Sequence, residues 1–253
     1  MNSLSMEIFS WAASRETSYI SDDMDFKIPY RYWEHAEHLL TYPENEHFLI
    51  DCIVNLKRAI DHRLKHLSAM YLFKKIPDSS RPSELLDILG YYGIARPRML
   101  REISQIRNLL EHHYKSPPTL SRCQELVEFS WYFLRSTDNI STLSLEGFIL
   151  KPEDKKFKDD YWLSIDYGPT KNWQCALRGW IPDSFLVDSK EGVNLSIHRI
   201  ETAAEWNVRM KDHLSESNEE FVKARKEGIY LSANVIKNSL FPSELTYMYF
   251  SVL

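Results

Sequence analysis

Four side chains with chemical potential stand close together between Arg107 and Tyr114, namely Arg107, Asn108, His112 and Tyr114. An arginine guanidinium offers a planar set of N–H donors that suits phosphate oxygens. An imidazole titrates near neutral pH and can therefore accept and return a proton. These residue types suit cleavage of a phosphodiester, with Arg107 stabilising charge on phosphorus, His112 as general acid and base, and Asn108 orienting the phosphate or His112.

The segment ends a predicted amphipathic helix that runs from Pro97 to about Tyr114. On a helical wheel that starts at Arg107 and advances 100° per residue, the apolar side chains fall between about 200° and 320°. Leu109 and His113 lie in this arc, so we expect both to pack in the core. The complementary polar arc holds Arg107, Asn108, Glu111, His112 and Tyr114.

The wheel separates the two reactive groups. Arg107 and His112 lie about 140° apart, so one ideal helix does not aim both at a single phosphate. Either the last turn of the helix unwinds, or two copies of the chain combine their polar faces in a two-fold dimer. The plainest alternative is that this arc is simply the solvated side of an amphipathic helix.

The elements around this helix follow from periodicity and from the positions of proline and glycine. Helices are predicted at 30–41, 45–73, 83–90, 97–114 and 119–137. Strands are predicted at 142–150, 160–167, 172–181, 193–200 and 245–252, with a helix at 203–214 or 218–226. The expected fold class is α+β, with an N-terminal helical bundle over 28–138 followed by a smaller β-rich domain over 139–253. Residues 1–27 remain unassigned.

The charges are unevenly spread along the 253 residues, whose net charge is −5. Residues 56–122 hold 13 basic and 6 acidic side chains, whereas residues 1–55 hold 3 basic and 10 acidic ones. Such a local cationic segment can attract a phosphate backbone although the whole chain is acidic. The candidate RNA-binding residues are Lys57, Arg58, Arg96, Arg98 and Arg101. A set of solvated helix faces would explain the same charges.

Several classes of protein are not expected. No apolar run reaches the roughly 18 residues of a membrane helix, and the first residues lack the pattern of a signal peptide. The three cysteines have no disulfide or metal-ligand spacing. His62 and His66 are four residues apart but lack a convincing third ligand, so we expect no metal and no cofactor. A cytoplasmic location is expected.

The motif resembles that of a known family. Arg107, the polar Asn108 and His112 match the signature of HEPN ribonuclease domains, and Arg-x4-His-x-Tyr, ending here at Tyr114, is similar to that of the HepT toxins. The resemblance covers residues 28–137. It implies a HEPN-like helical bundle and a metal-independent endoribonuclease, a toxin or phage-defence effector that acts on RNA as a homodimer. It also implies that Tyr114 accepts AMP from a nucleotidyltransferase antitoxin.

Two alternatives remain open from the sequence. One is a catalytically silent HEPN-like bundle that binds RNA, a nucleotide or a protein. The other is a structural or interaction protein in which the polar arc around His112 lies at a subunit contact. In the first case the chain would bind RNA without cleaving it; in the second, changes at His112 would alter the oligomeric state.

Overall fold

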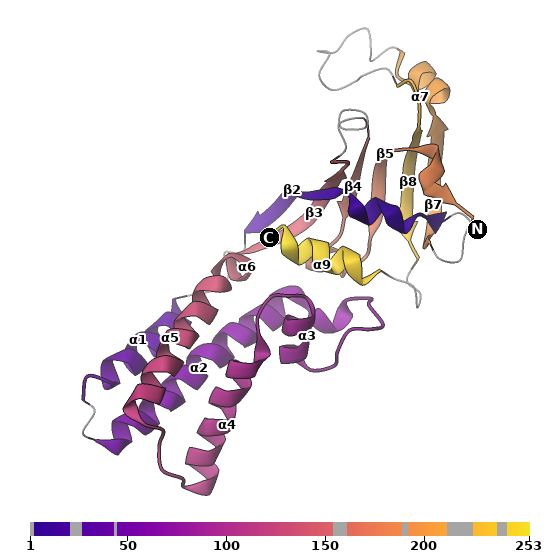
Figure 1. Ribbon diagram of the computed structural model, residues 1–253. Coiled ribbons are helices and arrows are strands. Elements are labelled where there is room, and N and C mark those ends of the chain that lie inside the picture. The colour runs from indigo at the N-terminus through magenta and orange to yellow at the C-terminus, as the bar shows by residue number, and fades with distance from the viewer. Residues whose placement is uncertain are drawn as a thin grey trace. The chain divides into compact units, whose positions relative to one another are not determined.

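A computed structural model describes residues 3–20, 27–42, 45–153, 161–188, 192–211, 225–236 and 242–253 (Figure 1). The chain divides into two compact units. The helical unit comprises Tyr19–Lys74, Arg81–Ser144 and Leu253. The sheet unit comprises Met1–Ser18, Lys75–Ser80 and Leu145–Val252. Among the described residues, no helix is both long and apolar enough to cross a membrane.

Six helices of the described residues belong to the helical unit. They are α1 (Ile28–Leu39), α2 (Glu46–Tyr71), α3 (Leu85–Tyr91), α4 (Pro97–His113), α5 (Leu120–Ser136) and α6 (Asp138–Thr142). The five predicted helices are confirmed, each end within two residues of the prediction. Local chemistry explains two of the starts, because the side chains of Asn45 and Thr119 accept the backbone N–H groups of His47 and Arg122.

The core of this unit forms around α2, which packs against α1, α4 and α5. Apolar side chains recur along α2 at intervals of three and four residues, so they line one side of the helix and are removed from water. The buried ones are Leu49, Cys52, Ile53, Leu56, Ala59, Ile60 and Leu67. Each fully buried leucine or isoleucine contributes about 1.5–3 kcal/mol to folding.

A buried arginine ties α2 to the end of α5 and to α6. Arg63 is 1% exposed, and its Nη1 donates hydrogen bonds to the Leu134 carbonyl at 3.1 Å and to the hydroxyls of Thr137 and Ser141 at 3.0 Å each. Its Nη2 lies 2.9 Å from a carboxylate oxygen of Asp138. A guanidinium without water needs such partners, because an unpaired buried charge costs several kcal/mol.

Replacing Asp138 by Asn tests this ion pair. We expect the free energy of unfolding to fall by about 2–3 kcal/mol, because the guanidinium of Arg63 stays buried without a counter-charge. Asp61→Asn is the matched control, since Asp61 pairs with Lys57 on the surface of α2 and such pairs contribute about 0–1 kcal/mol. Urea titrations that give equal losses for the two variants would contradict this role of Arg63.

Tyr30 on α1 joins the same cluster, since its hydroxyl donates a hydrogen bond to Asp138 at 2.7 Å. Burial and this hydrogen bond raise the pKa of Tyr30 to about 12. The folded state thus favours the neutral phenol of Tyr30. The contribution of this phenol to folding stability is complete below about pH 10 and is lost between about pH 10 and 12. We expect urea titrations across this range to show a steeper loss of stability in the wild type than in Tyr30→Phe. An equal loss of stability with pH in the two proteins would contradict this role of Tyr30.

Eight strands are described in the sheet unit. They are β1 (Ser3–Leu4), β2 (Ala12–Ile20), β3 (Leu143–Lys151), β4 (Trp162–Asp166), β5 (Ala176–Ile181), β6 (Leu186–Val187), β7 (Val193–Thr202) and β8 (Ile229–Val235). Their order in the sheet is β2-β3-β4-β5-β8-β7-β1-β6. From β3 to β7 the neighbouring strands pair antiparallel. Among the described residues, the helices α7 (Ala203–Arg209) and α9 (Ser243–Ser251) also belong to this unit.

One face of this sheet is apolar, because alternate side chains of a strand point to the same side. Leu163, Leu177 and Leu231 are buried on neighbouring strands. Figure 1 shows α9 crossing the strands of this unit. The hydroxyl of Tyr249 on α9 accepts the backbone N–H of Leu145 at 2.9 Å, which fixes the helix to the sheet.

The predicted arrangement, a helical bundle followed by a smaller β-rich domain, is wrong. The sheet unit is not the smaller one, and it takes β1 and most of β2 from the N-terminal residues that were left unassigned. The helices together with this large sheet are consistent with an α+β class. The chain therefore forms strands both before and after the helices of the bundle.

Other elements of the sheet unit also differ from prediction. The segment 245–252, rich in aromatic residues, was predicted as a strand but forms α9. Leu245 and Tyr249, four residues apart, are both buried, so tertiary packing favours the helix. Strand β8 was missed although Ile229, Leu231 and Ala233 alternate with more polar residues.

Candidate functional site

Helix α4 carries the predicted motif and ends directly after it. Pro97 begins the helix, where its missing N–H leaves no hydrogen bond unmade. Tyr114 ends it in the left-handed conformation with φ 50°, and its N–H donates to the Leu109 carbonyl. The helix is regular through His113, so its last turn does not unwind as one of the two predicted possibilities required.

The guanidinium of Arg107 is held along the helix. It forms an ion pair with Glu111 one turn later, and its Nη1 donates to the side-chain oxygen of Asn108 at 3.3 Å. The Arg107 side chain is 33% exposed, so it remains open to a ligand. Glu111 and Asn108 restrict its orientation, and a phosphate that binds there must displace or share the contact with Glu111.

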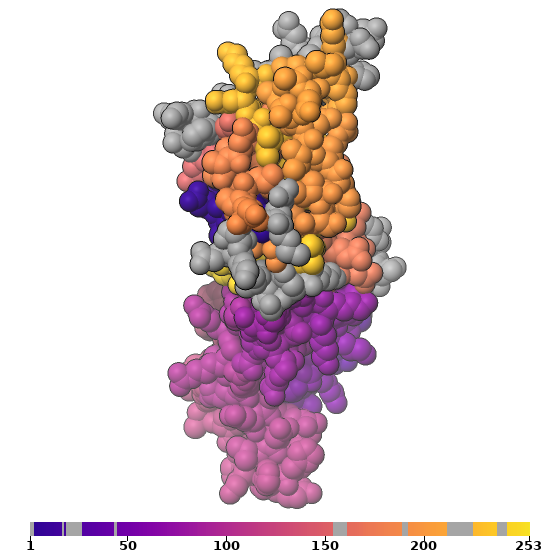
Figure 2. All heavy atoms as spheres, turned by 90° about the vertical axis from the view of Figure 1, so that its right-hand side faces the viewer, coloured from indigo at the N-terminus to yellow at the C-terminus, as the bar shows by residue number. Residues whose placement is uncertain are grey.

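His112 is exposed near the C-terminal end of α4 and forms no hydrogen bond or ion pair with any described residue. Figure 2 shows α4 at the surface of the helical unit. The prediction that His113 and Leu109 pack in the core is wrong, since His113 is exposed and Leu109 is 45% exposed. The buried side chains of α4 are instead Leu100, Ile103 and Leu110.

The new boundary between core and surface can be tested with two substitutions on the last turns of α4. We expect Leu110→Ala to lower the free energy of unfolding by about 2–4 kcal/mol, because it leaves a cavity in the core. His113→Ala should change it by less than about 0.5 kcal/mol, because an exposed side chain without partners loses little. If thermal or urea unfolding shows that His113→Ala lowers the free energy of unfolding more than Leu110→Ala does, His113 belongs to the core as the sequence predicted.

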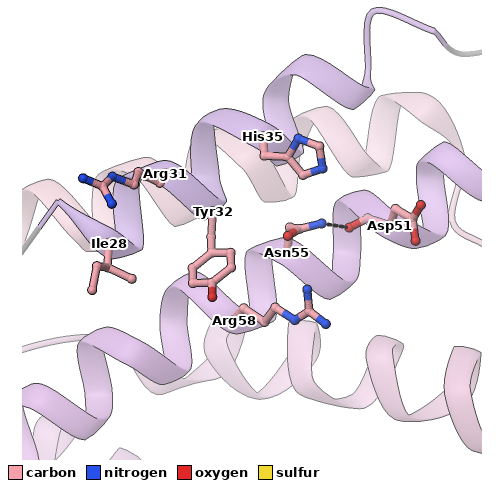
Figure 3. Close-up of a pocket in the computed structure, with 7 residues that line it drawn as sticks. All are labelled: Ile28, Arg31, Tyr32, His35, Asp51, Asn55 and Arg58. Atoms are coloured by element: carbon pink, nitrogen blue, oxygen red, sulfur yellow. Dashed lines mark hydrogen bonds between the residues drawn. The ribbon is translucent and has the colours of Figure 1, made fainter.

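Of the five predicted RNA-binding residues, Arg58 is the one that lines the groove described below. Lys57 pairs with Asp61 and Arg101 pairs with Asp87, so both charges are partly neutralised. Arg96 and Arg98 are exposed at the start of α4, and the rise of a helix puts Arg98 about 20 Å from His112 along the axis. Arg58 lines a groove between α1 and α2 (Figure 3).

The groove contains residues that sequence reasoning missed. Arg31 and His35 line it from α1, and Asn55 lines it from α2 together with Arg58. The signal was present, since Arg31 and His35 are four residues apart and so lie on one side of their helix. Neither residue was singled out from the sequence, because Arg31 and His35 lie in an acidic part of the chain.

His66 on α2 lies in structural surroundings. The Nε2 of His66 lies 2.5 Å from the backbone carbonyl of Ser141, and the side chain is buried. Over the described part of the chain, no group of three or more His, Cys, Asp and Glu side chains could hold a metal ion. His66 therefore belongs to the packing between α2 and α6.

Comparisons with known proteins do not assign a family. No protein-family model matches this chain, no curated protein matches its sequence and no solved structure matches its fold. Any functional assignment therefore depends on the chemistry and exposure of the described side chains.

Proposed function

We propose that this chain is a metal-independent endoribonuclease of the type that the Arg-x4-His motif suggests. The observation that carries the proposal is that His112 is exposed within the same two turns of α4 as a partly exposed Arg107. A general acid and base must reach its substrate, and a phosphate ligand must have donors open to solvent. Core burial of either side chain would have ended this proposal.

The proposed reaction is attack of a ribose 2′-hydroxyl on the adjacent phosphorus. His112 accepts the hydroxyl proton as the new O–P bond forms, and a proton returned from an imidazole leaves with the 5′-oxygen as its bond to phosphorus breaks. Arg107 donates hydrogen bonds to the phosphate oxygens as negative charge develops on them, and Asn108 orients the phosphate. The products are a 2′,3′-cyclic phosphate and a 5′-hydroxyl, and DNA is not a substrate because it lacks the nucleophile.

A two-fold homodimer would join the two groups that one helix keeps apart. In an antiparallel pair of α4 helices, an axis midway between positions 107 and 112 places Arg107 of one chain opposite the other chain's position 112. This midpoint falls between Leu109 and Leu110 in the sequence, and the polar arc that carries Arg107 and His112 is the side that faces the partner helix.

The proposal extends to regulation of the same site. Tyr114 is 90% exposed directly after α4, so its hydroxyl is open to a modifying enzyme. An AMP group transferred there by a nucleotidyltransferase antitoxin would add bulk and negative charge beside the motif and oppose RNA binding. The chain would then be a toxin or a phage-defence effector that acts on RNA in the cytoplasm.

Three variants assayed on a labelled RNA in the presence of EDTA test the proposal. We expect His112→Ala and Arg107→Ala each to lower the cleavage rate by about a hundredfold or more. His113→Ala is the matched control and should keep wild-type activity, because it removes a neighbouring exposed imidazole outside the motif. The product ends should carry the cyclic phosphate. A wild-type protein without activity, or equal rates for His112→Ala and His113→Ala, would disprove the proposal.

A further inference from the structure

The groove between α1 and α2 gathers cationic and polar groups from two helices of the helical unit. It has a volume of about 740 Å³ and is lined by Ile28, Arg31, Tyr32, His35, Asp51, Asn55 and Arg58. In Figure 3, Tyr32 extends from α1 toward Arg58 on α2, and His35 lies above Asn55. The spacing explains this convergence, since Asp51, Asn55 and Arg58 succeed one another at four and three residues on one side of α2.

The charges of the groove favour an anion. Two arginines and one histidine oppose the single carboxylate of Asp51. Arg58 is exposed and forms no ion pair or hydrogen bond with the described residues, although Asp51 lines the same groove. The neighbouring Lys57, by contrast, is paired with Asp61. Arg58 therefore offers its full set of donors to a ligand, which distinguishes it from most other cations of the helical unit.

We propose that this groove binds one nucleotide unit of single-stranded RNA, away from the bond that is cut. Arg58 and His35 hold the phosphate, since a guanidinium and an imidazole both donate hydrogen bonds to its oxygens. The ring of Tyr32 lies between the two helices and is only partly buried, so a base can stack on it. This inference rests on the proposed function for the choice of RNA as ligand.

Asp51 gives the site its preference for ribose. Its side chain is exposed, and the hydrogen bond from Asn55 goes to the Asp51 backbone carbonyl rather than to its carboxylate. A carboxylate accepts hydrogen bonds from hydroxyls, and the 2′-hydroxyl is the group that distinguishes RNA from DNA. A bare phosphate site would gain nothing from a negative side chain, which repels the ligand.

Fluorescence anisotropy with a labelled single-stranded RNA tests the phosphate contact. All proteins carry His112→Ala, which prevents cleavage if the proposed function is right and is harmless if it is wrong. We expect Arg58→Gln to weaken binding about tenfold at low salt and to reduce the slope of log K against log[salt] by about 1. Lys151→Gln removes the same charge from an exposed position of the sheet unit and should leave the slope unchanged. Equal effects of the two changes overturn the site.

The ribose contact has its own readout, the ratio of the affinities for RNA and for DNA of the same sequence. We expect Asp51→Asn to reduce this ratio several-fold without loss of DNA binding. An unchanged ratio overturns the role of Asp51, and unfolding curves confirm that each variant is folded. Failure of the groove is distinct from failure of the nuclease. If the wild type does not cleave RNA but Arg58→Gln weakens RNA binding, the groove proposal stands and the nuclease proposal fails. If the wild type cleaves RNA but Arg58→Gln does not weaken binding, the groove proposal fails.

Discussion

The buried guanidinium of Arg63 is the constraint on which the helical unit depends. Its bonds reach the Leu134 carbonyl at the end of α5 and Ser141 in α6, and Asp138 supplies the counter-charge. A charge with so little water is stable only when its partners occupy one geometry. Since Arg63 also belongs to α2, the long helix against which α1 and α4 pack, this geometry fixes the framework that supports both the groove and the motif.

Helix α2 thus packs against both elements to which a function is proposed, α1 at the groove and α4 with the motif. One side of α2 packs on α1 and forms the groove that Arg58 lines. Helix α4, which carries Arg107 and His112, also packs on α2. In the proposed function the groove would add affinity through a phosphate and discriminate ribose through Asp51, whereas α4 would perform the chemistry. Such a division is common in proteins that act on nucleic acids, because contacts to the backbone position the chain and do not take part in the reaction.

The sequence predicted where helices form better than it predicted which of their side chains are buried. The helix from Pro97 followed from its proline and its periodic apolar residues, and the structure confirms it. Whether Leu109 and His113 face a neighbour could not be predicted, because a wheel shows which residues share a side but not where the packing partner ends. Tertiary contacts likewise overrode the strand propensity of the segment that forms α9. Arg63 was passed over because its partners lie about 70 to 80 residues away in the sequence.

The composite site at paired α4 helices is the central claim, and mixing two inactive variants tests it most directly. Arg107→Ala and His112→Ala chains are purified separately, mixed under conditions that allow subunit exchange and assayed on RNA. A heterodimer then contains one site with Arg107 from one chain and His112 from the other, so roughly a quarter of wild-type activity should return. No recovery after demonstrated exchange would contradict a site that two chains share.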